Sequence, residues 1–150
     1  MSEHHARIGW KRTTPDFAYD TYNREHEWRF KGGNVVAASA APAFKGRDDR
    51  VDPEDAFVAT LSSCHMLTFL AIAARKRLAV DFYEDDADGH LEKNADGKLA
   101  MTRVTLRPRV RFAEGVVVDA ATLDRMHHQA HEQCFIANSV KTDVRVEPAA

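Results

Sequence analysis

Residues 52–78, which read DPEDAFVATLSSCHMLTFLAIAARKRL, form the most apolar stretch of the chain and decide its fold. Asp52 can cap the free amides of a helix, Pro53 suits the first turn, and the acidic residues that follow oppose the positive end of the helix dipole. A basic cluster complements the other end, so we predict a helix from Pro53 to about Leu78. Its apolar side chains keep to no single stripe, which is typical of a helix buried on most sides. We expect a sheet and a second subunit to cover it.

The composition is that of an ordinary globular protein. The chain has 150 residues, of which 44% are hydrophobic and 29% charged, values that exclude a disordered or fibrous design. A net charge of −2 gives no reason to expect nucleic acid or an anionic membrane as a partner. The first residues lack the apolar core of a signal peptide, and the longest apolar run is far below the ~20 residues that cross a bilayer. We therefore expect a cytoplasmic protein.

The rest of the chain predicts a single α+β domain over residues 17–150, preceded by a polar N-terminal leader over residues 1–16. Alternating apolar and polar residues, divided by turn-forming glycines and asparagines, predict strands and hairpins on both sides of the long helix. Pro108 marks an edge strand or a bulge, and Asp119 caps a second helix. The order β-β-α-β-β-α-β segregates helices from antiparallel strands. The expected segments are strands over 17–36 and 34–41, a hairpin of 80–93 with 98–112, a helix over 120–133 and a strand over 142–147.

The two cysteines have different surroundings. Cys64 lies midway along the predicted long helix, whereas Cys134 follows the second helix and opens the segment Cys-Phe-Ile-Ala-Asn-Ser. A thiol in an apolar helix is inert unless a cation stabilises its thiolate, so Cys64 alone is equally well explained as a small core residue. Ser62 and Ser63, however, are small and polar where a packed core would hold larger groups, and His65 adds a titratable side chain. These neighbours indicate a cavity beside Cys64.

Both cysteine motifs resemble those of the OsmC/Ohr family, the osmotically inducible and organic-hydroperoxide-resistance proteins. Asp-Pro-Glu at residues 52–54, followed after nine residues by Cys64 and an apolar helix, is similar to the family's central-helix motif. Cys134, followed after a short spacer by Asn-Ser, is similar to its second motif. The resemblance covers about residues 17–148.

The resemblance implies an antiparallel sheet that wraps a long buried central helix, in an intertwined homodimer with active sites at the subunit interface. The chain departs from the family's hydroperoxide reductases, which have Cys-Phe in the helix and Cys-Pro in the second motif. Here the corresponding pairs are Cys64-His65 and Cys134-Phe135. This departure points to an OsmC-like side branch.

As for activity, the resemblance implies a thiol-dependent peroxidase, an organic hydroperoxide reductase of the oxidative stress response. Cys64 matches the peroxidatic cysteine, Cys134 the resolving cysteine, and Glu54 the carboxylate that pairs with an essential arginine. The family places that arginine on the first hairpin, where Arg29 fits best. The other candidates are Arg24, Arg47 and Arg50.

The expected chemistry starts with a Cys64 thiolate that attacks an organic hydroperoxide and becomes a sulfenic acid. Cys134 then condenses with the sulfenic acid to give an intramolecular disulfide. We expect no bound cofactor; an external dithiol such as a lipoyl group would restore the thiols. An apolar pocket beside Cys64 would favour alkyl or fatty-acid hydroperoxides. The expected pocket residues are Phe57, Leu61, His65 and Met66.

Helix geometry restricts how Glu54 can contribute. Ten residues of unbroken helix separate Glu54 from Cys64 by about 15 Å along the axis. The two side chains therefore serve one site only if the helix breaks between them or if Glu54 acts on the partner subunit's side.

Two alternative functions remain open at the level of sequence. His127, His131 and Cys134 have the spacing i, i+4, i+7, which would place them along one helical face as ligands for zinc or copper. Alternatively, the chain is a non-enzymatic OsmC-like binding module that uses an arginine stripe on the second hairpin arm. Acidic residues on the facing arm would explain that stripe without a ligand. The stripe consists of Arg103, Arg107, Arg109 and Arg111, and the acidic residues are Asp81, Glu84, Asp85, Asp86 and Asp88.

Overall fold

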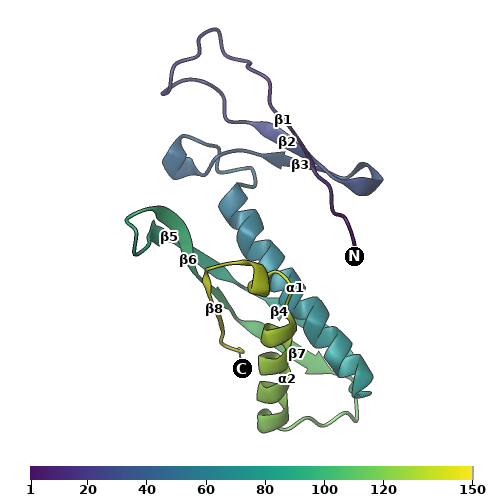
Figure 1. The fold of residues 1–150 in the computed structure, drawn as a ribbon. Coiled ribbons are helices and arrows are strands. Elements are labelled where there is room, and N and C mark those ends of the chain that lie inside the picture. Colours follow the sequence, from purple (N-terminus) through teal and green to yellow (C-terminus); the bar gives the residue numbers. More distant parts are fainter. Residues whose placement is uncertain (150) are drawn as a thin grey trace. The chain divides into compact units, whose positions relative to one another are not determined.

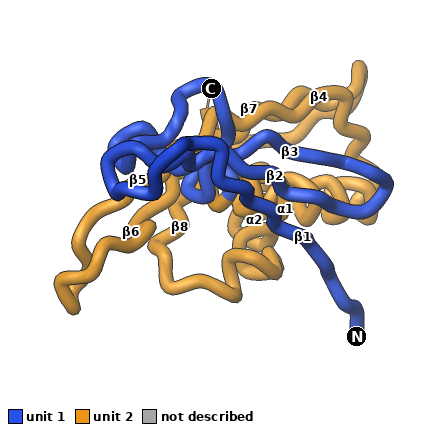
Figure 2. The backbone as a smooth tube through the Cα atoms, turned by 90° about the horizontal axis from the view of Figure 1, so that it is seen from above, with its two compact units in different colours: residues 1–56 blue, residues 57–150 orange. Residues whose placement is uncertain are grey.

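The computed structural model describes residues 1–149, which divide into two compact units, one ending at Ala56 and one beginning at Phe57 (Figure 2). The last residue of the predicted domain, residue 150, lies outside the described part. The two units are described separately below. Their elements confirm the α+β class, with two α-helices and several small sheets among the described residues (Figure 1).

The first unit contains a three-stranded antiparallel sheet of β1 (Arg7–Gly9), β2 (His26–Arg29) and β3 (Val35–Ala38), in that order. A 3-10 turn, Lys31–Gly33, joins β2 to β3 as the sequence predicted, because Gly32 and Gly33 both have positive φ angles. Strands β2 and β3 have four residues each and are shorter than the strands predicted over 17–36 and 34–41. The stretch expected as a polar leader contributes β1, whose backbone pairs with β2 despite its exposed side chains. A second 3-10 turn, Pro42–Phe44, follows β3.

Helix α1, Pro53–Arg75, begins as its sequence predicts and ends three residues before the expected Leu78. The Asp52 carboxylate accepts a hydrogen bond of 2.8 Å from the Asp55 backbone N–H and so caps the first turn. At the other end Arg77 takes a left-handed conformation, with φ 59°. The Leu78 N–H then donates to the Ala73 carbonyl, and the Arg77 N–H donates to the preceding turn, as in a Schellman motif. The helix stops there because this motif satisfies its last carbonyls.

In the second unit the predicted hairpin is present but divided into two short sheets. One pairs β4 (Val80–Asp85) with β7 (Pro108–Phe112), and the other pairs β5 (Asp88–Lys93) with β6 (Leu99–Leu106). Pro108 opens β7, a position where its missing N–H costs no ladder bond. The last strand, β8 (Asp143–Val146), lies parallel to β6.

Helix α2, Ala120–Gln133, packs beside the C-terminal half of α1 (Figure 1). Its cap is the predicted one: the Asp119 carboxylate accepts from the Thr122 N–H at 2.6 Å. Two core clusters hold the unit together. The first joins Phe69, Ile72 and Ala73 of α1 to Met126 and Ala130 of α2. The second joins Leu61 of α1 to Val104 and Leu106 of β6.

The described residues leave much of α1 uncovered. By length and composition alone the helix could cross a membrane, yet only 28% of its most apolar window is buried. Leu67, for example, is 61% exposed. In a single copy of the chain, the strands and α2 cover the Leu61 and Phe69 faces of the helix and leave the Leu67 face open. The sequence predicts that a second subunit provides the remaining cover.

Candidate active site

The site centres on two free thiols that the second unit brings together from distant parts of the chain. Cys64 lies in the middle of α1 and is partly exposed, whereas Cys134, the residue that ends α2, is 1% exposed. The sequence suggested a deeply hidden Cys64. The structure reverses this expectation, because the more accessible of the two sulfurs is the one on the long helix.

The segment after Cys134 is a tight turn whose own residues hold it. The Asn138 N–H donates to the Cys134 carbonyl at 3.0 Å, and the Asn138 side chain donates to the Glu132 carbonyl. The Ser139 hydroxyl donates to the Phe135 carbonyl at 2.7 Å. The Asn-Ser pair of the second motif therefore closes the loop that fixes the Cys134 sulfur, which itself accepts an N–H from Ala137 at 3.4 Å.

The two thiols lie close enough to influence each other. Burial, and in second place the neighbouring Cys64 side chain, raise the pKa of the Cys134 thiol to about 11. Cys134 is therefore a protonated thiol at neutral pH, positioned beside the more accessible Cys64. This arrangement suits Cys64 as an attacking group and Cys134 as a second thiol that follows.

Cys64 opens onto a groove of about 720 Å³, a volume in the range of ligand sites. The groove confirms the cavity that the small polar residues beside Cys64 predicted, since Ser63 lies in its wall. Its walls are mostly apolar. The lining residues are Ala59, Thr60, Ser63, Cys64, Leu67, Thr68, Ala71 and Arg75 of α1 with Gln133, Phe135 and Ile136.

The pocket residues expected from the sequence lie elsewhere. Leu61 is fully buried in the second core cluster, and Phe57 packs against the same cluster. His65 is 1% exposed and faces α2, and Met66 does not line the groove. The helical period accounts for His65 and Met66, which point about 100° and about 160° away from Cys64. It does not account for Leu61 and Phe57, which lie three and seven residues before Cys64; the strand residues Val104 and Leu106 pack against that side of the helix.

A buried pair of histidines joins the two helices. A hydrogen bond of 3.1 Å links His65 Nε2 to His127 Nδ1, and the His127 ring stacks on Phe69. The pKa of each imidazole is lowered to about 4, mainly by burial and, for His65, also by the neighbouring imidazoles of His127 and His131. Both rings are therefore neutral at pH 7, and one nitrogen of the linking bond carries its proton. His65 Nδ1 and His127 Nε2 are buried with no hydrogen-bond partner among the described residues.

The histidines do not assemble the metal site considered from the sequence. Within residues 1–149, no three His, Cys, Asp or Glu side chains are grouped so that they could hold a metal ion. His127 turns toward His65, and Cys134 lies beyond the last turn of α2, so the spacing i, i+4, i+7 does not converge on one point. The alternative with His127, His131 and Cys134 therefore lacks the geometry that it needs.

Two of the four arginines in the stripe of the binding-module alternative, Arg107 and Arg109, are paired with the facing acidic arm. The Arg107 guanidinium forms an ion pair with Asp88, and the Arg107 backbone N–H donates to the Asp85 carboxylate at 2.6 Å. Arg109 lies 3.9 Å from Glu84 across the β4–β7 pair. Opposite charges on neighbouring strands thus account for these arginines without an anionic ligand.

Glu54 and Arg29 belong to the first unit. Glu54 lies in the first turn of α1, where partial burial and the nearby Asp52 raise the pKa of its carboxyl group. Helix α1 is continuous from Pro53 to Arg75, so no break brings Glu54 toward Cys64. Arg29 is an exposed residue of β2 whose guanidinium donates to Glu27 at 2.5 Å.

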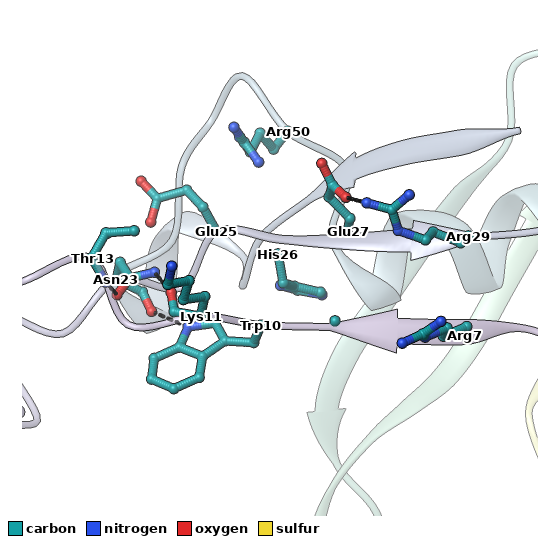
Figure 3. A pocket seen from close by; sticks show the side chains of 11 residues that line it. Arg7, Trp10, Lys11, Thr13, Asn23, Glu25, His26, Glu27, Arg29 and Arg50 are labelled. Atoms are coloured by element: carbon teal, nitrogen blue, oxygen red, sulfur yellow. Dashed lines mark hydrogen bonds and ion pairs between the residues drawn. The ribbon is translucent and has the colours of Figure 1, made fainter. Parts of the chain in front are cut away.

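Arg29 lines a polar hollow of about 570 Å³ within the first unit (Figure 3). Arg7, Lys11 and Arg50 lie around the same hollow, with Glu25 and Glu27 as the opposing charges.

Two other candidate arginines, Arg24 and Arg47, already have partners within the first unit. Arg24 is buried, donates to the backbone carbonyls of Tyr19 and Tyr22, and stacks on the Tyr22 ring at 3.6 Å. Arg47 forms a bidentate ion pair with Asp49, with both hydrogen bonds at 2.7 Å.

The chain belongs to a known family. The family described as OsmC-like protein matches residues 46–149, more than half of the chain. The fold, the continuous central helix and the two cysteine motifs thus confirm the OsmC/Ohr assignment that the sequence motifs suggested. No curated protein matches the chain.

Solved structures extend the match over the whole length. An OsmC-like protein of unknown function from Vibrio cholerae is 49% identical, covers 99% of this chain and 100% of its own, and has a TM-score of 0.95. The organic hydroperoxide resistance protein OsmC from Legionella pneumophila is 13% identical over the full length of both chains, with a TM-score of 0.73. The organic hydroperoxide resistance protein OhrB of Bacillus subtilis is 18% identical, covers 97% of this chain and 98% of its own, and has a TM-score of 0.68. At these lower identities the likeness shows the fold.

Proposed function

We propose that this protein is a thiol-dependent peroxidase that reduces organic hydroperoxides, with Cys64 as the peroxidatic and Cys134 as the resolving cysteine. The observation that carries the proposal is the proximity of a partly exposed Cys64 in an apolar groove to a buried, protonated Cys134. Membership of a family whose solved members include proteins named for organic hydroperoxide resistance supports it.

The first step is a displacement at oxygen. The Cys64 thiolate attacks the distal peroxide oxygen, the O–O bond breaks, and the alkoxide leaves and takes up a proton from solvent as the alcohol. Cys64 is thereby oxidised to a sulfenic acid. The apolar walls of the groove suit an organic group on the leaving oxygen better than hydrogen peroxide.

The second step forms the disulfide. The Cys134 sulfur attacks the Cys64 sulfenic acid, and water leaves with the Cys134 proton and the hydroxyl group of the sulfenic acid. Because the neutral Cys134 thiol is a poor nucleophile, this step needs a base to remove its proton. An external dithiol, such as a protein-bound lipoyl group, then reduces the disulfide by thiol exchange and is itself oxidised. Such a reductant fits the cytoplasmic location that we also propose.

Two further features belong to the proposal. We assign to Glu54 and Arg29 the carboxylate and arginine roles of the family, with the arginine favouring the Cys64 thiolate and the developing alkoxide.

We also propose a homodimer, because the open apolar face of α1 is a surface that a second copy would bury.

The test measures consumption of cumene hydroperoxide under a dithiol recycling system. The wild type and the Arg29→Lys and Glu54→Gln variants are compared with Cys64→Ser and Cys134→Ser. We expect no consumption by Cys64→Ser, and one stoichiometric turnover followed by overoxidation in Cys134→Ser. Arg29→Lys and Glu54→Gln should lower the rate while both thiols remain free. Failure of the wild type to consume the peroxide would contradict the proposal.

Mixed dimers test whether the site is shared between subunits. We expect the Cys64→Ser and Glu54→Gln variants each to be inactive or slow when assayed alone. If Glu54 completes the partner's site, mixing and re-equilibrating the two variants restores activity in a fraction of the dimers. Without any restored activity, Glu54 would have to act within its own subunit or not at all.

A further inference from the structure

The face of α2 that packs on α1 carries a row of three residues with titratable side chains (Figure 1). His127, His131 and Cys134 follow one another along this face at the spacing i, i+4, i+7. They make no metal site because they lie in line along the helix rather than around one point. At one end of the row His127 bonds to His65 of α1, and at the other end Cys134 lies beside Cys64. His131 therefore lies between the histidine pair and the reacting sulfurs.

His131 is the histidine of α2 nearest in sequence to Cys134. Residues three apart on a helix are neighbours, with about 5 to 6 Å between their Cβ atoms. The Cys134 backbone N–H donates to the His131 carbonyl at 3.3 Å, so the helical spacing still holds at Cys134. The pKa of His65 is lowered mainly by burial and also by the nearby imidazoles of His127 and His131. His131 is therefore close to the same α1–α2 interface that holds both thiols.

The His131 ring joins the interior to the surface. Its Nδ1 atom is buried and has no hydrogen-bond partner among residues 1–149, whereas the residue as a whole is only half-buried. The open edge of the ring lines a hollow of about 380 Å³ beside α2 and β8. An imidazole so placed can take a proton from the interior and exchange it with solvent. The lining residues of the hollow are Asp124, His127, His128 and His131 of α2 with Val144, Val146 and Pro148.

The proposed peroxidase reaction needs such a group. The Cys134 thiol, whose pKa is raised to about 11 mainly by burial, attacks only after it has lost its proton. Burial holds the pKa of His65 and His127 at about 4, which makes both rings weak proton acceptors. Histidine is otherwise the side chain best suited to proton transfer near neutral pH. His131 is the remaining histidine of the row.

We propose that His131 is the general base of the disulfide-forming step. This inference rests on the proposed peroxidase function and names the base that its second step requires. The Cys134 proton passes to His131, the resulting thiolate attacks the Cys64 sulfur, and the S–O bond of the sulfenic acid breaks. The leaving hydroxide takes up the proton that His131 holds, so that one water is released and the imidazole is neutral again.

The other ionisable groups near His131 determine how a pH profile is interpreted. The buried imidazoles, with pKa values of about 4, and Cys134, at about 11, do not titrate between about pH 6 and 9. An inflection of the rate in this range therefore belongs to another group, and a variant of the neighbouring His128 tests that imidazole separately. The ionisable groups on the surrounding elements are Asp124, His127, His128 and Cys134 of α2, Cys64 and His65 of α1, and Asp85 of β4.

The experiment follows the second step by itself. Wild type, His131→Gln and His128→Gln are treated with one equivalent of cumene hydroperoxide, quenched with acid at intervals and analysed by mass spectrometry, which separates the sulfenic acid from the disulfide. His128→Gln is the matched control, because its side chain is 75% exposed and pairs with Glu132. We expect His131→Gln to form the sulfenic acid at the wild-type rate and the disulfide about ten to a hundred times more slowly at neutral pH.

The pH profile separates a base from a merely structural residue. In wild type the rate of disulfide formation should rise and then level off between about pH 6 and 9, whereas in His131→Gln it should rise about tenfold per pH unit throughout. Added imidazole should restore part of the rate to His131→Ala. Equal rates in wild type and His131→Gln, equal slowing in His128→Gln, or a slowed His131→Gln that keeps the wild-type profile would overturn the inference. An unbroken rise in the wild type would also overturn it, and that result needs no variant.

A route without peroxide separates failure of this inference from failure of the proposed function. Methyl methanethiosulfonate converts the more accessible Cys64 into a mixed disulfide, and attack by Cys134 then releases methanethiol, with the same need for a base. Slower release from His131→Gln supports the base even if cumene hydroperoxide is not reduced. Equal release from wild type and variant rejects the base even if peroxides are consumed.

Discussion

The buried histidine pair should make the stability of this protein fall as the pH drops below 6.5. His65 and His127 are 1% and 3% exposed, and burial lowers the pKa of each to about 4 in the folded chain. In the unfolded chain each titrates at about 6.5. Between these values the unfolded state binds protons that the folded state does not, so acid favours unfolding. Stability from the pair is complete above pH 6.5 and is lost as the pH falls toward 4.

The two pKa values give the size of the effect. At pH 5.0 each histidine lowers the free energy of unfolding by about 2 kcal/mol relative to pH 7.5, and the pair by about 4 kcal/mol if the sites titrate independently. That is a large part of the 5–15 kcal/mol available to a typical domain. Protonation of both rings would also break the hydrogen bond between His65 Nε2 and His127 Nδ1 and place two cations side by side.

The assay is urea denaturation at fixed protein concentration, at pH 7.5 and 5.0, for wild type and the double variant His65→Leu/His127→Met. Carboxylates contribute to the pH dependence of both proteins, so the difference between their slopes isolates the histidines. We expect the double variant to lose about 4 kcal/mol less than wild type over this range. His128→Gln is the control, because its side chain is 75% exposed and should behave as wild type. Equal pH slopes in wild type and the double variant would refute the reasoning.

Two substitutions test the packing around α1. Gly89→Ala should lower the free energy of unfolding by about 1 to 3 kcal/mol, because its methyl group would lie 2.6 Å from both Val58 and Met101; a neutral effect in urea denaturation would show that the strand can shift. Leu61→Ala should cost about 2 to 5 kcal/mol, because Leu61 is fully buried. Leu99→Ala, at a position 58% exposed, is its control and should change stability little; equal losses at the two sites would contradict the core described above.

Local signals predicted the elements well because they act over a few residues. The caps at Asp52 and Asp119 mark the true starts of both helices. The alternation along the second hairpin arm correctly placed Val104 and Leu106 in the core, but Thr105 of the opposite face is buried as well, at 4% exposed. The early stop of α1 could not be read so easily, since Arg77 adopts a left-handed conformation that glycine usually supplies.

The site was only half predictable, because apolar residues surround α1 on every side. The two motifs identified Cys64 and Cys134, which the fold brings together. Which face of α1 opens onto a groove depends on where the strands and α2 pack, and these contacts join residues far apart in sequence. His65, taken for a pocket residue, is instead held by His127, 62 positions away.

The most direct measurement of the central claim is mass spectrometry of the protein after one equivalent of linoleic acid hydroperoxide. The account predicts an intact mass lower by two hydrogens and a single cross-linked peptide pair containing Cys64 and Cys134. In Cys134→Ser the same treatment should leave a Cys64 sulfenic acid that a dimedone probe captures. An unchanged mass, or oxidation of Cys64 without any link to Cys134 in the wild type, would contradict the account.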